Sequence, residues 1–179
     1  MTPRMWLSVV VLAAVVLLAC WGMWRGWAAR RRRSADAVPT ALPAAPADLG
    51  LARTDALEAQ YVTTTRSGDW LDRVAADGLG VRGRATVQVF DAGVRIDRVG
   101  EPGVFVPASA LRAASTAPGM AGKFVGREGL VVLTWAADPN DERGLDTGLR
   151  TRHAADRDLL VAAASALIEP GTAGREENA

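Results

Sequence analysis

The hydrophobic pattern of the chain is strongest near its start, between Met5 and Trp24, where 20 consecutive residues carry no charge. At a rise of about 1.5 Å per residue, a helix of this length spans about 30 Å, the thickness of a bilayer's hydrocarbon core. Trp6 stands at one end, and Trp21, Trp24 and Trp27 crowd the other, where indole rings favour the headgroup region. The pattern predicts one transmembrane helix.

Beyond residue 52 the apolar positions fall into short runs that are typical of strands. Residues 59–65 are rich in β-branched side chains, and residues 84–98 alternate apolar and polar positions around a turn at 91–93, which predicts a hairpin. The continuously apolar run at 130–135 is expected to be the most buried strand. Further strands are expected over 104–106, 112–116 and 145–150.

Two segments depart from the strand pattern. After the first strand, Trp70, Leu71 and Val74 indicate a helical turn whose apolar side chains fill the core. From 154 to 168 apolar residues recur at helical spacing, with Asp156 in the first turn, where the helix dipole favours it. About seven antiparallel strands followed by one helix predict a mainly β fold, either a small barrel or two orthogonal sheets, with the helix capping one open end.

Composition sets the expected boundaries of the parts. Residues 34–52 are rich in Ala and Pro and bury little, so we expect a semi-extended tether that reaches up to about 55 Å. Residues 169–179 are polar and are expected to form a disordered tail. Residues 53–168 then form one β domain, and residues 1–33 form the anchor with its basic flank.

The net charge of +1 is the sum of two unlike parts. Residues 1–51 have a net charge of +4, whereas residues 52–179 have a net charge of −3. The apolar run is followed by a basic cluster, and the positive-inside rule places such a cluster in the cytoplasm. We therefore expect a single-pass cell-membrane protein with its N-terminus outside and its C-terminal domain cytoplasmic. The anchoring cluster consists of Arg30, Arg31, Arg32 and Arg33.

A competing interpretation rests on Cys20, the only cysteine, which also excludes a disulfide framework. Residues 17–20 read Leu-Leu-Ala-Cys and resemble the lipobox of bacterial lipoproteins, in which the cysteine is acylated and the rest is exported. The apolar run continues to Trp24, whereas lipoproteins usually turn polar after that cysteine. The uncleaved anchor is therefore favoured, and an exported lipoprotein is the alternative.

Several stretches resemble a family of actinobacterial membrane-anchored PH-like (pleckstrin-homology-like) proteins, namely residues 61–65, 68–74, 93–98 and 145–148. The resemblance covers about residues 5–168. Arg supplies 20 of the 21 basic residues, as expected from a high-GC genome. Family members are sometimes labelled transporters or exported proteins, but one span cannot line a solute path. The resemblance implies a PH-like fold without a defined activity.

Few residues have the spacing that catalysis or metal binding requires. Residues 78–83 spell GxGxxG, but they do not open a βαβ unit, so a loop is expected. His153 has no nucleophile motif beside it. The acidic run at 138–142 lacks EF-hand spacing, so a solvated hairpin tip is favoured over a Ca²⁺ site. We expect no enzyme activity, no cofactor and no metal.

Binding is the better-supported class of function. PH domains that bind phosphoinositide headgroups usually use basic residues around the first hairpin, which here gives the candidates Arg82, Arg84, Arg95 and Arg98. Acidic residues interleave with these, and the domain is net acidic, so ordinary surface charge is favoured over anionic-headgroup binding.

The expected partners are the lipid bilayer and another protein. Nucleic acid is not expected, because the basic cluster at 30–33 is not part of a soluble stretch with interleaved aromatic residues. The sequence thus indicates a binding or scaffold module at the inner face of the cell membrane. An accessory subunit of a membrane transporter or enzyme is a further alternative.

Overall fold

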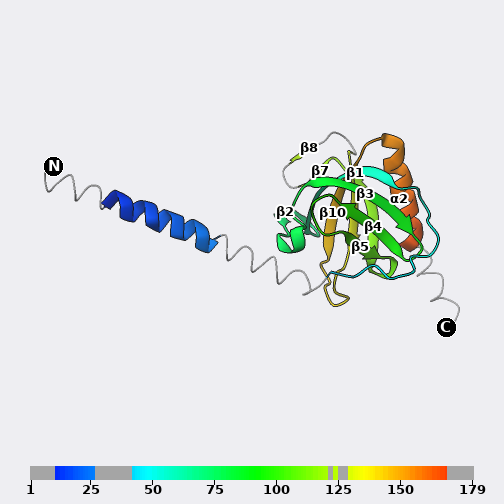
Figure 1. Ribbon diagram of the computed structural model, residues 1–179, viewed down its shortest axis with the longest axis horizontal. Helices are drawn as coiled ribbons and strands as arrows, with labels where there is room; N and C mark the ends of the chain where they lie inside the picture. Colours follow the sequence, from blue (N-terminus) through cyan, green and yellow to red (C-terminus); the bar gives the residue numbers. More distant parts are fainter. Residues whose placement is uncertain (1–10, 27–41, 121–122, 125–128, 169–179) are drawn as a thin grey trace.

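The computed structural model describes residues 11–26, 42–120, 123–124 and 129–168 (Figure 1). Residues 11–26 form a helix whose large apolar side chains are exposed. Within the described part of the chain, no helix is both long and apolar enough to cross a membrane. The expected tail lies outside the described residues, as do the expected anchor residues Trp6, Trp27, Arg30, Arg31, Arg32 and Arg33.

The rest of the described chain is mainly β, as expected, and ends in a helix. The strands are β1 (Leu57–Arg66), β2 (Asp69–Arg73), β3 (Gly83–Phe90), β4 (Gly93–Arg98), β5 (Val104–Pro107), β6 (Leu111–Ala117), β7 (Gly119–Met120), β8 (Lys123–Phe124), β9 (Leu130–Trp135) and β10 (Leu145–Thr151). Two short 3-10 helices, η1 (Ala76–Gly78) and η2 (Ala108–Ala110), lie in connections, and α2 (Ala154–Ile168) comes last.

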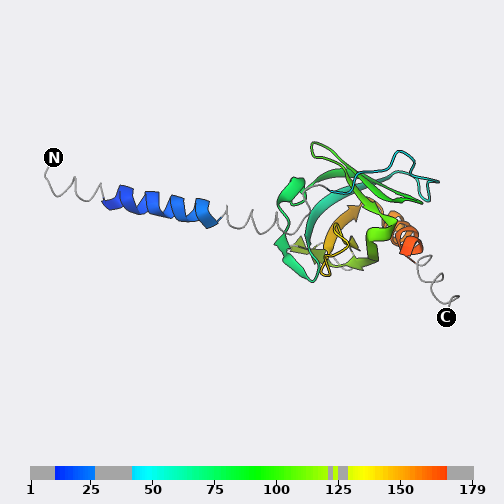
Figure 2. The same ribbon diagram turned by 90° about the horizontal axis from the view of Figure 1, so that it is seen from below.

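Seven of these strands form one curled antiparallel sheet in the order β5-β4-β3-β1-β10-β9-β6, and β2 pairs with β1 as an eighth member. Figure 2 shows how the sheet curves around its own interior. The expected hairpin is confirmed as β3 and β4, and the expected C-terminal helix as α2. Strands β7 and β8 pair separately.

The central strand β1 pairs with both β3 and β10, and a bulge divides it. The register with β10 shifts between Tyr61 and Thr63, which leaves Val62 as an extra residue. Val62 packs in a second apolar cluster beside Met120 and Leu130, whereas Tyr61 belongs to the main core. Because a bulge bends a strand and increases its twist, this point helps the sheet to curl.

The core fills the concave side of the sheet, and α2 covers its open side (Figures 1 and 2). Trp135 and Tyr61 are the largest fully buried side chains. The helix packs mainly against β6 and also contacts β3, β4, β9 and β10. It buries Leu160, Ala164 and Leu167, at the helical spacing that the sequence indicated.

A chain of hydrogen bonds between side chains runs through this core. The hydroxyls of Tyr61 and Thr64 lie 2.5 Å apart, and that of Thr64 lies 2.8 Å from the hydroxyl of Thr147. The indole Nε1 of Trp135 donates to the Thr147 hydroxyl at 2.9 Å. Burial raises the pKa of Tyr61 to about 12, although its Thr64 hydrogen bond and Arg98 act to lower it. Tyr61 therefore stays protonated and donates to the carbonyl of Leu79.

The prediction of a helical turn around Trp70 is wrong. Residues 69–73 form β2, because the chain turns at Ser67 and Gly68 and pairs back onto β1. Trp70 and Leu71 are exposed rather than inserted into the core, and Val74 alone of the three is buried. The Trp70 indole instead donates to a carboxylate oxygen of Asp146 at 3.3 Å.

Residues 42–52 belong to the segment that was expected to be a tether, and the structure places them against the domain. Leu42 packs against the main core, and Ala52 forms a bridge with Phe90. The backbone carbonyls of Leu49 and Leu51 accept hydrogen bonds from the turn between β3 and β4. This part of the segment therefore follows the surface of the domain rather than extending freely.

Candidate functional site

The four arginines singled out from the sequence do not converge on one site. Arg98 is buried, whereas Arg82, Arg84 and Arg95 are on the surface. Arg95 lies on β4 and forms an exposed ion pair with Asp97 at 3.0 Å. Arg82 and Arg84 lie near a different part of the sheet, where they meet arginines that the sequence did not single out.

Arg98 has a structural position rather than a ligand-binding one. Its guanidinium carbon lies 4.7 Å from the centre of the Tyr61 ring, and its nitrogens donate to three backbone carbonyls. Those carbonyls belong to Asp77, Gly78 and Pro102. Arg98 thus fastens η1 and the connection between β4 and β5 to the core, and these bonds use three of its five N–H donors.

Arg84 belongs to a row of outward-facing side chains across three strands. Gln60 of β1 is directly opposite Arg84 of β3 and also opposite Arg150 of β10. The next residue on β3, Ala85, faces the core, so by strand alternation Arg84 points to the outer face. The two arginines therefore flank Gln60 at a separation of about two strand spacings, or about 10 Å.

A groove of about 610 Å³ follows this row on the outer face of β1, β3 and β10. We call it the arginine groove. Arg152 also lines it, and Arg82 approaches its lining by donating to the side chain of Gln60. Val99 is the apolar side chain exposed at the groove, whereas the side chains of Ala59 and Ala85, which also line it, face the core.

The acidic residue of the groove, Glu58, is already paired. Arg152 donates to its carboxylate at 2.6 Å, and this hydrogen bond, together with the charge of Arg152, lowers the pKa of Glu58. Among the described residues, Arg84 and Arg150 have no hydrogen-bond or ion-pair partner. The lining therefore carries positive charge that the described part of the chain does not neutralise.

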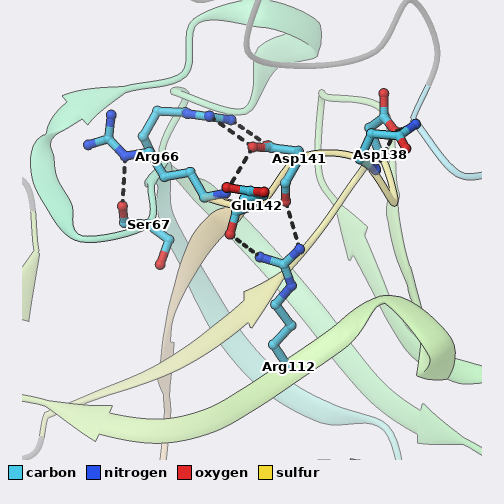
Figure 3. A network of polar contacts seen from close by, with 8 residues as sticks. Arg66, Ser67, Arg112, Asp138, Asp141 and Glu142 are labelled. Carbon is cyan, nitrogen blue, oxygen red and sulfur yellow. Dashed lines mark hydrogen bonds and ion pairs between the residues drawn. The ribbon is translucent and has the colours of Figure 1, made fainter.

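The acidic run at 138–142 lies in the loop between β9 and β10, where arginines from two other strands tie it down (Figure 3). Arg66 donates to both carboxylate oxygens of Asp141, at 2.6 and 3.0 Å. Arg112 donates to the backbone carbonyls of Asp141 and Glu142. Burial raises the pKa of Asp141, but the hydrogen bonds from Arg66 and from backbone amides outweigh it and hold that pKa below its usual value.

Side chains that could bind a metal do not cluster in the described part of the chain. Within it, no three His, Cys, Asp or Glu side chains are arranged to hold a metal ion. His153 is exposed just before α2 begins. The GxGxxG string at 78–83 follows η1 and leads into β3, so it does not form the phosphate-binding turn before a helix.

Arg150 and Arg152 are the groove residues that sequence reasoning missed. Both stand near the end of a strand recognised as such, 60 to 70 positions from Arg82 and Arg84. The pairing of β1 with both β3 and β10 brings the two sets together. The alternation within residues 145–150 places Arg150 on the face opposite Leu149, and this alternation is the sequence signal that could have identified Arg150 as an outward-facing residue.

Comparison with known proteins identifies the family. A family model of bacterial PH domain-like proteins matches residues 39–165, and this match ends within α2. The comparison with curated proteins finds no match. The seven-stranded curled sheet and its C-terminal helix agree with the PH-like fold that the resemblance implied. The chain therefore belongs to the bacterial PH domain-like family.

Proposed function

We propose that this protein is a binding or scaffold module without enzymatic activity, tied by its N-terminal segment to the inner face of the cell membrane. Membership of the PH domain-like family supports a binding role. The unneutralised positive charge of the arginine groove supports binding of an anionic ligand.

The observation that carries the membrane part is the uncharged run between Met5 and Trp24, with four consecutive arginines after it at 30–33. A span of this length matches a bilayer, and the basic cluster favours cytoplasmic retention of the C-terminal domain. The described helix at 11–26 falls within and just beyond this run, and its apolar side chains are exposed.

The test is the topology of the full chain in a bacterial membrane. A C-terminal green fluorescent protein should be fluorescent, and a C-terminal alkaline phosphatase should be inactive, because that enzyme needs export. Replacing Arg30, Arg31, Arg32 and Arg33 with Gln should produce phosphatase activity by weakening cytoplasmic retention. Full phosphatase activity of the unmodified chain, or its release from membranes at high salt, would contradict the proposal.

An exported lipoprotein is the second candidate, and Cys20 with the three residues before it favours it. The helix at 11–26 continues past this cysteine, which suits an uncleaved span better. Mass spectrometry of the membrane fraction decides between them. An intact N-terminus whose mass is unchanged by Cys20→Ala, apart from the substitution itself, supports the anchor, whereas cleavage before Cys20 and a lipid mass on it support the lipoprotein.

A further inference from the structure

The arginine groove is the part of the described surface where unpaired charge and a concave shape coincide. Arg84 and Arg150 face the same side of the sheet on either side of Gln60, and neither has a partner among the described residues. Their neighbour Arg152 is held by Glu58. Two such guanidinium groups, on strands about 10 Å apart, can reach the same ligand from both sides.

The ligand of such a groove is expected to be anionic and longer than a single ion. A lone phosphate would use the guanidinium groups and leave the exposed side chain of Val99 and the amide of Gln60 without a contact. In an extended peptide, side chains at i and i+2 project to one side about 6.7 Å apart, within reach of two long arginines. The peptide backbone between the acidic residues then passes over Gln60 and Val99, and the intervening side chains point away from the groove.

A lipid surface suits this face less well than a peptide does. Residues 53–168 carry a net charge of −1, and a bilayer meets a broad face rather than a single groove. On this face Asp97 of β4 is opposite Thr86 of β3, which in turn is opposite Glu58. Both carboxylates would approach an anionic leaflet together with the arginines.

We propose that the arginine groove binds an extended acidic segment of a partner protein, with Arg84 and Arg150 as the residues that contact its carboxylates. This proposal rests on the binding role in the proposed function, but not on the membrane anchor. Arg82 and Arg152 contribute long-range attraction while they remain bonded to Gln60 and Glu58.

The experiment measures binding of a fluorescent peptide, Glu-Val-Glu-Val-Glu, to the full chain in a nonionic detergent by fluorescence anisotropy. The matched control peptide is Gln-Val-Gln-Val-Gln. The unmodified protein should bind the glutamate peptide at least about tenfold more tightly than the glutamine peptide, and added salt should weaken the binding. Equal affinity for the two peptides would overturn the proposal.

The protein variants locate the binding. The double variant Arg84→Gln with Arg150→Gln should weaken binding of the glutamate peptide by about tenfold. Arg150→Gln alone should weaken it by about threefold. The matched control, Arg73→Gln with Arg95→Gln, removes the same charge from exposed strand positions outside the groove and should change affinity less than about twofold. Equal losses in both double variants, at unchanged thermal unfolding, would show nonspecific attraction and overturn the proposal.

A competition arm separates the peptide from a lipid headgroup. Glycerol phosphate, the charged part of a simple phospholipid, should displace the peptide only at concentrations far above the peptide's dissociation constant. Displacement at similar concentrations that disappears in the Arg84 and Arg150 double variant would identify a phosphate site and overturn the proposal. The outcome does not depend on membrane topology, so failure here is distinguishable from failure of the proposed anchor.

Discussion

Two groups of arginines in this domain differ in what their guanidinium groups contact. At the loops, Arg98 and Arg112 donate to backbone carbonyls, and Arg66 pairs with a carboxylate. On the outer face of the sheet, Arg84 and Arg150 have no partner among the described residues. The residue type is the same, and neither group forms a sequence motif. The difference shows that an arginine with hydrogen-bond partners inside the protein stabilises the fold, whereas an arginine without such partners is free to bind a ligand.

The largest expected difference in stability between the two groups of arginines is at Arg98. Arg98→Ala removes three hydrogen bonds to carbonyls and the contact with the Tyr61 ring, so we expect the free energy of unfolding to fall by about 3 kcal/mol. Urea denaturation followed by tryptophan fluorescence measures this change. Arg95→Ala, on the exposed side of the same strand, is the control and should cost less than about 0.5 kcal/mol. A similar loss of unfolding free energy in both variants would contradict the distinction between structural and exposed arginines.

The next largest effect on stability is expected at Tyr61, whose ring contacts Arg98. Tyr61 is the only tyrosine of the chain. Its absorbance near 295 nm should titrate at about 12 in the folded protein rather than at 10.0. Because the unfolded chain loses this proton first, stability should fall as pH rises through this interval. Tyr61→Phe should cost about 1–2 kcal/mol at neutral pH and should lack that additional loss. Titration near 10 without unfolding would contradict the burial of this hydroxyl.

The ion pair between Arg66 and Asp141 predicts a stability contribution that depends on acidic pH. Asp141→Asn weakens the bond to Arg66 that ties the loop between β9 and β10, and we expect a loss of about 1 kcal/mol at pH 7. The pKa of Asp141 is lowered in the folded state, so this stabilisation is present above 3.8 and disappears as pH falls through the folded value. Thermal unfolding of both proteins should therefore converge at low pH. A difference that persists there would assign the effect to packing.

The smallest effect on stability is expected in the arginine groove itself. Arg84→Gln and Arg150→Gln remove exposed charges that have no described partner, so each should change the free energy of unfolding by less than about 0.5 kcal/mol. Relief of repulsion between the arginines makes a slight increase in stability the expected direction. Urea denaturation with and without the glutamate peptide provides the check. A loss above about 1 kcal/mol would show that these residues support the fold.

Much of the fold follows from local patterns in the sequence. The alternation at 84–98 and the change to helical spacing after 154 each concern neighbouring residues, and β3, β4 and α2 confirm them. The segment around Trp70 was misread because its apolar side chains looked like core residues. Pairing with β1 through the turn at Gly68 determined its structure instead, and local composition does not reveal that pairing.

The candidate site was harder to predict, because it depends on which strands become neighbours. Arg84, which the sequence singled out, lines the arginine groove, but Arg98 lies on the opposite face of the sheet, so the two residues do not form one site. Arg150 joins Arg84 only through the register that Gln60 has with both. Register is a property of the assembled sheet, and a shift by one residue would place these side chains on the other face.

The docking of residues 42–52 onto the domain changes how far the domain can travel from the membrane anchor proposed above. Without this docking, about 18 residues would form a leash of up to roughly 55 Å, whereas the eight residues 34–41 reach only about 25 Å as an extended chain. The accessible volume scales with the cube of that length, so it shrinks about tenfold. For a partner in the same membrane, the effective concentration of the arginine groove then rises by the same factor, without any new contact.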